Sequence, residues 1–206
     1  MAADTRDRIT YAAMTLFATK GYASTSIADI LAAAEVNSGS LYHFFPGKQD
    51  VLLAVLEAYR DGIAPMLLAP AWKGVRDPIE RVFALLKHYR RHLRTSACTY
   101  GCPIGSLALE LHEPDPVVRE LLAANFRGWI DAIEACLVEA GERLPRDTDR
   151  RALATLALST MEGGVMLSRT DRTLTGFDDA VRMFRDYVNR LEEAAGPRAP
   201  ARRRRA

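Results

Sequence analysis

The spacing of apolar residues constrains the fold of this chain more than any other feature of its sequence. Apolar side chains recur every three or four residues from Ile9 to about residue 195. This period places them on one face of a helix, so it predicts amphipathic α-helices. No segment of useful length alternates with a period of two, the pattern that predicts strands. The expected fold is therefore all-α, with about nine helices.

Capping and turn residues predict the ends of these helices. Asp-Pro pairs at residues 77–78 and 115–116 each combine an N-cap with a proline in the first helical turn. Ser26 and Asp29 have the spacing of a capping arrangement. Prolines and a glycine within residues 65–74 predict turns and a short linker. After three short helices in the first 45 residues, the predicted helices cover 48–60, 78–94, 104–112, 116–140, 149–169 and 177–195.

The formal net charge of +2 conceals an uneven distribution of charges. Five of the positive charges are arginines after Pro197, so the rest of the chain is net negative. Any nucleic-acid binding must then use a local patch instead of the field of the whole molecule. The arginines repel one another and no large apolar residue accompanies them. Residues 196–206 are therefore expected to form a disordered arginine-rich tail.

The sequence favours a cytoplasmic location without a membrane partner. Charged residues interrupt every stretch long enough to span a bilayer. The first residues, MAADTRDR, lack the basic and apolar regions of a secretory signal. Three cysteines are too few and too unevenly placed for a disulfide framework, so reduced thiols are expected.

Residues 37–52, NSGSLYHFFPGKQDVL, carry the clearest functional pattern. They contain the third of three short helices, and two short helices joined by a few residues form a helix-turn-helix. Since residues three and four apart share a helix face, Leu41, Phe44 and Phe45 are expected to point inward. The small polar residues then face outward, where they can enter a DNA major groove. The predicted DNA contacts are Thr25, Ser26, Ser38, Gly39, Ser40, Tyr42, His43 and Lys48, the last of these to a phosphate.

Residues 4–56 resemble the DNA-binding domain of the TetR family of transcriptional regulators. The matching elements are an alanine- and phenylalanine-bearing first helix, Gly-Tyr at 21–22, Thr-Ser-Ile-x-Asp-Ile at 25–30 and Ser-Leu-Tyr-x-x-Phe-Pro-x-Lys at 40–48. Farther along, YGCPIGSLALEL resembles a subgroup of small-molecule-responsive repressors related to the lincomycin and flavonoid efflux regulators.

Two residues depart from the pattern of the family. Glu35 stands in a turn where the family usually has glycine, and a left-handed backbone there would cost about 1 kcal/mol relative to glycine. Phe44 stands where the family commonly has histidine, which removes one phosphate contact. His43 is the residue that could partly replace it.

The resemblance implies a homodimer in which the last two long helices of each subunit form a four-helix bundle. Each half would read one arm of a palindromic operator, and a small ligand in the larger domain would alter the spacing of the two halves. It further implies a helix-turn-helix domain at residues 1–50 and a ligand-binding and dimerisation domain at 51–195. The apolar seam expected at the dimer interface contains Leu156, Thr160, Gly164, Val181, Phe184, Val188 and Leu191. An intramolecular core is the alternative interpretation of this seam.

Aromatic residues three and four apart on the long helix at 116–140 are candidate walls of an apolar pocket, although such residues are most often core. The candidate ligand contacts are Cys102, Phe126, Trp129, Ile130, Met161 and Met166. A pocket of this kind predicts a hydrophobic or aromatic effector.

Cys102 also supports a second hypothesis, a thiol-based redox or electrophile sensor, which requires a lowered thiol pKa. A buried structural cysteine is the simpler interpretation. His88, His92, Cys98 and Cys102 partly match zinc-ligand spacing, but neighbouring arginines disfavour a dication, so no metal is predicted.

The sequence predicts a ligand-responsive, DNA-binding transcriptional regulator, expected to be a repressor, and no cofactor. It contains no phosphate-binding glycine loop, Gly-x-Ser-x-Gly elbow or His-Glu-x-x-His motif. The chain is therefore not expected to be an enzyme. An all-α enzyme that uses the cavity of the larger domain is the most distant alternative.

Overall fold

The computed structural model describes residues 5–196, and all regular secondary structure within this range is helical. The prediction of an all-α fold is confirmed. The prediction of a disordered arginine-rich tail concerns residues 196–206, which lie outside the described range apart from Gly196.

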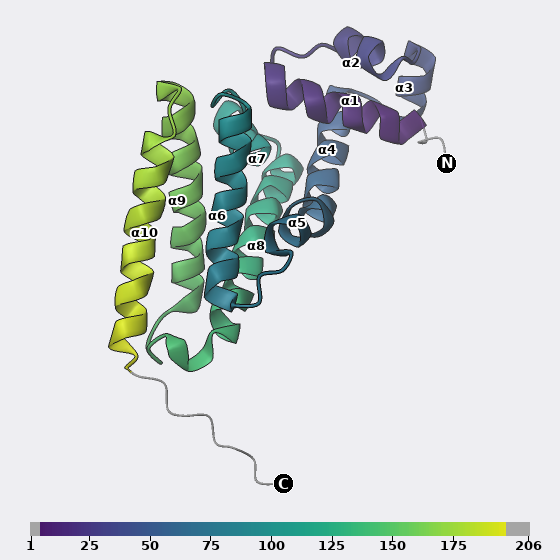
Figure 1. The fold of residues 1–206 in the computed structure, drawn as a ribbon. Coiled ribbons are helices and arrows are strands. Elements are labelled where there is room, and N and C mark those ends of the chain that lie inside the picture. Colours follow the sequence, from purple (N-terminus) through teal and green to yellow (C-terminus); the bar gives the residue numbers. More distant parts are fainter. Residues whose placement is uncertain (1–4, 197–206) are drawn as a thin grey trace.

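Three short helices form a unit at the N-terminus, at the upper right of Figure 1. They are α1 (Thr5–Lys20), α2 (Ile27–Ala34) and α3 (Ser38–Phe44), and α1 also packs against helix α4 (Lys48–Gly62). The side chains of Ile9, Phe17, Ile30 and Leu41 are buried between them. This apolar centre fixes the orientation of α3, because Leu41 anchors its inner face.

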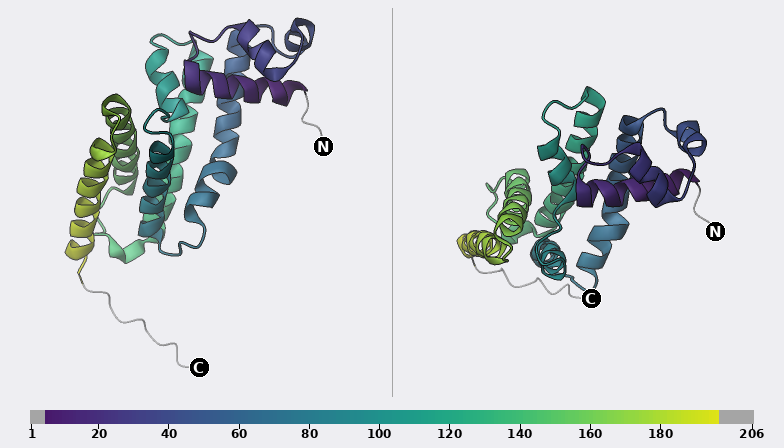
Figure 2. Two further views of the ribbon diagram at one scale, coloured as in Figure 1. Left: turned by 45° about the horizontal axis from the view of Figure 1, so that its top comes forward. Right: turned by 90° about the horizontal axis from the view of Figure 1, so that it is seen from above.

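The remaining long helices stand side by side below this unit. They are α6 (Pro78–Thr95), α8 (Pro116–Glu139), α9 (Arg150–Asp171) and α10 (Thr175–Ala194), with the short helix α7 (Pro103–Glu110) and the 3₁₀ turn η2 (Gly141–Arg143) between them. Helix α8 packs against α4, α6 and α9. Helices α9 and α10 form the edge of the molecule away from α1–α3 (Figure 2).

The prediction of turns and a linker after residue 60 is wrong for most of that segment. The chain continues as a π-helix, η1 (Ile63–Leu68), and then as the short helix α5 (Ala69–Trp72). Proline lacks an N–H and its ring clashes with the preceding turn of an α-helix, and the wider π-helical turn around Pro65 relieves both conflicts. A turn follows only at Gly74, where φ is +79°.

The predicted caps of α2 are present, and they define the turn on each side of it. Ser26 Oγ accepts the Asp29 N–H at 3.0 Å, and Asp29 Oδ2 accepts the Ser26 N–H at 2.8 Å. Hydrogen bonds from the Ser26 backbone and hydroxyl, and from Lys20, lower the pKa of Asp29 to about 2. After α2, Glu35 has the left-handed conformation expected for it, with φ of 53°. Arg8 Nη2 donates to the Ala34 carbonyl at 2.6 Å and so holds this turn against α1.

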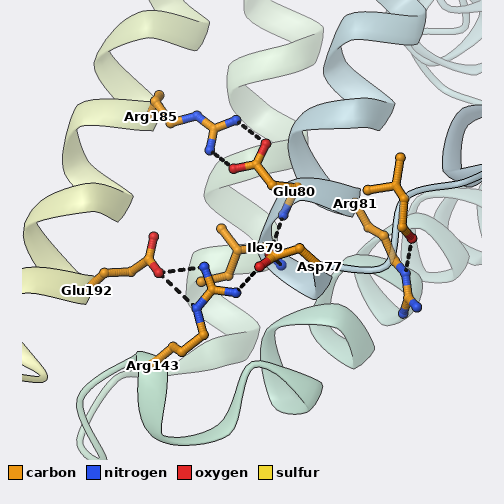
Figure 3. A network of polar contacts seen from close by, with 8 residues as sticks. Asp77, Ile79, Glu80, Arg81, Arg143, Arg185 and Glu192 are labelled. Carbon is orange, nitrogen blue, oxygen red and sulfur yellow. Dashed lines mark hydrogen bonds and ion pairs between the residues drawn. The ribbon is translucent and has the colours of Figure 1, made fainter. Parts of the chain in front are cut away.

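At the other end of the molecule, a polar network joins α6, η2 and α10 (Figure 3). The guanidinium of Arg143 donates to Glu192 Oε1 from Nη2 at 2.7 Å and is also paired with Asp77. Asp77 is in turn the N-cap of α6, as the sequence predicted. Arg185 of α10 pairs with Glu80 of α6 through a second pair of contacts. The network fixes the lower ends of three elements that are distant in the sequence.

Candidate DNA-binding face and ligand pocket

Helix α3 presents a small polar face to solvent. Ser38, Gly39, Tyr42 and His43 are exposed, and 55% of the Tyr42 surface is accessible. On the opposite side Leu41 is buried, as is Phe45 just after the helix, while Phe44 and Ser40 are half-buried. The Asn37 side chain caps the helix by accepting the Ser40 N–H at 2.8 Å, a role that the sequence analysis did not assign.

The two predicted contacts at the start of α2 differ in accessibility. Ser26 is exposed, although its hydroxyl is engaged in the α2 cap. Thr25 is only 1% exposed, and its hydroxyl donates to the Gly21 carbonyl at 2.7 Å. The Thr25 side chain therefore holds the turn before α2 and is not offered to solvent, contrary to its proposed role in DNA contact.

Lys48 lies at the first residue of α4, beside the turn that joins α1 to α2. Its Nζ is 4.3 Å from the centre of the Tyr22 ring and 3.5 Å from the Ala23 carbonyl oxygen. Burial lowers the pKa of the Lys48 ammonium, and the carboxylates of Glu110 and Asp29 oppose this shift. Lys48 is half-buried, and the Tyr22 ring holds its ammonium group beside the N-terminal end of α4.

The same turn receives a carboxylate from the larger part of the chain. Glu110, the last residue of α7, accepts the Tyr22 N–H on Oε2 at 2.9 Å and the Ala23 N–H on Oε1 at 2.7 Å. Gly21 has φ of +86°, and a Cβ there would lie 3.1 Å from both carboxylate oxygens. Glycine is required at this position both for the backbone and for the approach of Glu110.

A cavity of about 230 Å³ lies between the end of α4, η1, α6 and α8, and the segment before α7 closes it. Its wall is mainly aromatic and aliphatic. The lining residues are Tyr59, Gly62, Ile63, Met66, Leu67, Tyr89, His92, Leu93, Tyr100, Gly101, Cys102, Pro103, Ile104, Asn125 and Trp129. The Asn125 amide already donates to two backbone carbonyls, those of Leu56 and Leu121. The cavity thus offers mainly apolar surface with a few polar groups.

Two of the six predicted ligand contacts, Cys102 and Trp129, line this cavity. Phe126 and Ile130 are half-buried elsewhere on α8, and Met161 is buried on α9. Met166 is exposed and lines a separate groove between the end of α1 and α9. The sequence analysis missed the cavity residues of segment 59–67, because Pro65 suggested a turn where the helical period in fact continues.

Cys102 is a buried thiol, only 2% exposed, which agrees with the simpler interpretation of the sequence, a buried structural cysteine. Burial raises the pKa of the Cys102 thiol, and the adjacent Glu162 carboxyl raises it further. Its sulfur accepts the Gly105 N–H at 3.4 Å and caps α7. A thiol sensor needs the opposite shift and an accessible sulfur, so this environment argues against that hypothesis.

Two family models match this chain. The model of bacterial regulatory proteins of the TetR family matches residues 9–55, which contain most of α1, all of α2 and α3, and the first half of α4. The model of the C-terminal domain of LmrA/YxaF-like transcriptional regulators matches residues 78–183, about half of the chain. The chain belongs to the TetR family. The recognition made from the sequence is confirmed for both parts.

Relatives and solved structures agree with this assignment over most of the regulator's length. The HTH-type transcriptional regulator MT0206 of Mycobacterium tuberculosis is 31% identical over 89% of this chain and 93% of its own. YxaF of Bacillus subtilis is 29% identical over 84% and 88%. The crystal structure of a regulatory protein TetR from Rhodobacter sphaeroides has 26% identity and a TM-score of 0.79, over 88% of this chain and 97% of that one. These proteins are DNA-binding transcriptional regulators and not enzymes.

In this TetR-family regulator, the seam predicted for dimerisation divides between the core and the surface. Phe184 and Val188 are buried, with the Phe184 ring 5.4 Å from that of Phe83. Gly164 is also buried, and a Cβ there would lie 3.0 Å from the Phe177 Cα. These three therefore serve the core, and the close approach allowed by Gly164 is that of α10 within the same chain. Thr160, Val181 and Leu191 are half-buried, and Leu156 is exposed.

The histidine pair of α6 does not belong to a metal site in the part of the chain that the structure describes. His88 and His92 contact each other through their Nε2 atoms at 3.0 Å, and residues 5–196 contain no group of three side chains suited to a metal ion. Within the same residues, no helix is both long and apolar enough to cross a bilayer.

Proposed function

We propose that this regulator is a repressor that binds a palindromic operator as a homodimer and releases it when a small molecule occupies the cavity. The observation that carries the proposal is the two-sided character of α3. Its exposed side is small and polar, as a helix in the major groove requires, and its inner side is anchored by Leu41 and Phe45. Such a protein acts where the DNA is, which favours the cytoplasm.

The proposed DNA contacts are the exposed residues of α3 with Lys48. Ser38 and Gly39 allow close approach to base edges, while Tyr42 and His43 extend farther toward bases or phosphates. The Lys48 ammonium lies where a phosphate could meet both it and the first amides of α4. We keep residues 1–50 as the proposed DNA-binding domain and 51–195 as the proposed ligand-binding and dimerisation domain.

The test of this proposal is binding to the DNA upstream of the regulator's own gene, at two salt concentrations. Tyr42→Ala should weaken specific binding by at least about tenfold, since one good contact contributes about 1–3 kcal/mol. Lys48→Ala should weaken binding and reduce the salt slope by about one unit, because one phosphate contact is lost. Lys87→Ala, which removes an exposed lysine of α6, is the control. Binding indifferent to both changes would refute the role of this face.

The proposed effector is a neutral, hydrophobic or aromatic molecule. No lysine, arginine or carboxylate lines the cavity, so a charged ligand would lose hydration there with only the His92 ring and a few hydroxyl, thiol and amide groups to replace it. The wall includes Trp129, whose fluorescence can report occupancy once the other tryptophan is changed by Trp72→Phe.

In that background, 2-naphthol should quench Trp129 and bind at least about tenfold more tightly than the anion 2-naphthoate. The difference is expected because only the anion carries a desolvation penalty into the cavity. Ile63→Phe, which fills the cavity from η1 and adds no second tryptophan, should weaken the binding of 2-naphthol. Equal or tighter binding of the anion would contradict the proposed effector class.

A further inference from the structure

A groove on the outer side of α6 is separate from both the DNA-binding face and the cavity. It has a volume of about 760 Å³ and lies between α5 and α10, which stand on either side of α6 (Figure 1). None of the residues that line it lines the cavity. Helix α10 packs mainly against α9, so it leaves part of α6 facing solvent. The groove therefore stays open in the folded subunit.

The groove is strongly basic. Six lysines and arginines line it, against two carboxylates, and both carboxylates are paired. Arg90 of α6 donates to Asp178 of α10 from Nε at 2.6 Å and from Nη2 at 2.7 Å. Arg185 of α10 donates to Glu80 of α6 from Nη2 at 3.0 Å (Figure 3). The cations that remain give the groove a field that attracts anions.

The remaining cations are spread over the floor and both walls. Lys87 and Arg91 are exposed on the floor, and neither forms an ion pair within residues 5–196. They are four residues apart, so they lie one turn apart on the same face of α6. Lys73 stands on the α5 side of the groove. Arg182 stands on the α10 side, where it pairs with the exposed Asp179.

Apolar surface lies between these charges. Ala84 and Val181 are half-buried and line the groove from α6 and α10. Ala84 shares its face of α6 with Lys87 and Arg91, because the spacings are three and seven residues. A partner that combines carboxylates with apolar side chains would therefore match both parts of the groove.

The groove and the proposed dimer seam use different flanks of α10. Tyr187 lines a separate groove with Leu156 of α9. Arg185 and Tyr187 are two residues apart, which is a rotation of about 200° around a helix, so they project from nearly opposite sides. A dimer formed through α9 and α10 would leave the basic groove accessible.

We propose that this groove docks an acidic amphipathic helix of another protein. Single exposed ion pairs are weak, so a partner must meet several of these cations at once to bind measurably. A helix places carboxylates one turn apart, which matches the spacing of Lys87 and Arg91. Its apolar stripe would cover Ala84 and Val181. Duplex DNA could use the cations, but it would gain nothing from the apolar floor.

A labelled peptide tests the proposal on the full chain, without DNA or effector. The probe is a fluorescein-labelled peptide that repeats the heptad Glu-Leu-Ala-Ala-Leu-Glu-Glu, and fluorescence anisotropy at low salt follows its binding. It should bind at least about tenfold more tightly than the same peptide with glutamine in place of glutamate. Serine in place of leucine should weaken binding several-fold, because the apolar floor is then left uncovered. Equal binding within either pair of peptides would overturn the proposal.

Charge reversal on α6 tests the position of the site. Lys87→Glu combined with Arg91→Glu should weaken binding of the acidic peptide at least about tenfold, and should strengthen binding of the lysine version by a similar factor. Arg119→Glu combined with Arg146→Glu changes the net charge equally at two exposed arginines outside the groove, and should change neither affinity. Equal losses in the two double variants would reduce the effect to net charge and overturn the proposal.

Two further measurements separate the other outcomes. Ala84→Gln fills the floor without a change in charge and should weaken the acidic peptide several-fold, so the proposal is tested even if the charge-reversed chain does not fold. If Lys87→Glu with Arg91→Glu weakens binding of unrelated duplex DNA and leaves the peptide unaffected, the groove is a nucleic-acid surface and the proposal is wrong. Operator binding should persist in all these variants, because the groove contains no residue of α1–α3. Failure of either proposal therefore leaves the other standing.

Discussion

Glu162 is an unusual residue in this structure, because a half-buried carboxyl group lies between α7 and α9. Its Oε1 has no hydrogen-bond partner, and its other oxygen packs against Gly105. Burial raises the pKa of the Glu162 carboxyl, which the nearby Cys102 thiol only partly offsets. The folded protein therefore binds this proton more tightly than the unfolded chain does.

This difference sets the pH dependence of stability at Glu162. A raised carboxyl pKa contributes its full stabilisation below the unfolded value near 4.5, and the contribution is lost as pH rises through the folded pKa. Glu162→Gln should therefore raise the free energy of unfolding at pH 7 by about 1 kcal/mol and change it little near pH 4. Urea unfolding of the variant and the wild type at both pH values would measure this difference in unfolding free energy. A difference that favours the variant less at pH 7 than at pH 4 would contradict the prediction.

At the level of the helix, the ends of α6 and α10 depend on a single arginine. The side chain of Arg143 is 20% exposed and bridges Asp77, the N-cap of α6, to Glu192 in the last turn of α10. Hydrogen bonds from the α6 backbone and from Arg143 lower the pKa of Asp77 against the opposing effect of burial. The cap and the bridge therefore reinforce each other.

Arg143→Met should lower the free energy of unfolding by about 1–2 kcal/mol, because two partly buried carboxylates lose a shared donor. Since the lowered pKa of Asp77 stabilises the fold above its unfolded value near 3.8, the loss should shrink as pH falls below that value. Arg146→Met, which removes an arginine with a 92% exposed side chain, is the control. Equal stability of Arg143→Met and Arg146→Met at pH 7 would contradict the account.

The helices also show which parts of the molecule sequence reasoning can reach. Helical period and Asp-Pro caps are local signals, so α6, α8 and α9 begin within a residue of their predicted starts. Segment 63–72 was missed because a π-helical turn accommodates Pro65, and this depends on packing against the rest of the chain. The cavity residues Ile63, Met66 and Leu67 were missed for the same reason. Others, such as Tyr89 and Asn125, lie on regular helices, but no local signal in the sequence shows that they face a cavity. The bond from Glu110 to a turn 88 residues earlier has no local signal at all.

At the scale of the whole molecule, α9 and α10 carry exposed apolar side chains at the interface proposed for a second copy of the chain. Leu156 and Tyr187 are more than 40% exposed, and they line one groove on this face together with Leu191. Met183 and Leu167 add further exposed apolar surface on the same two helices. Exposed apolar side chains gathered on one pair of helices are typical of a protein interface. The buried members of the predicted seam would then support the interface from behind.

The central claim is that two copies of α3 read DNA together, and footprinting on the regulator's own upstream DNA tests it most directly. Two protected patches about 34 Å apart on one face of the duplex are expected, one for each subunit. Leu156→Glu should place a charge in the interface, give a monomer by ultracentrifugation and abolish the paired footprint, while Val138→Glu at an exposed site of α8 should not. A single patch, or a paired footprint that Tyr42→Ala leaves unchanged, would contradict the account.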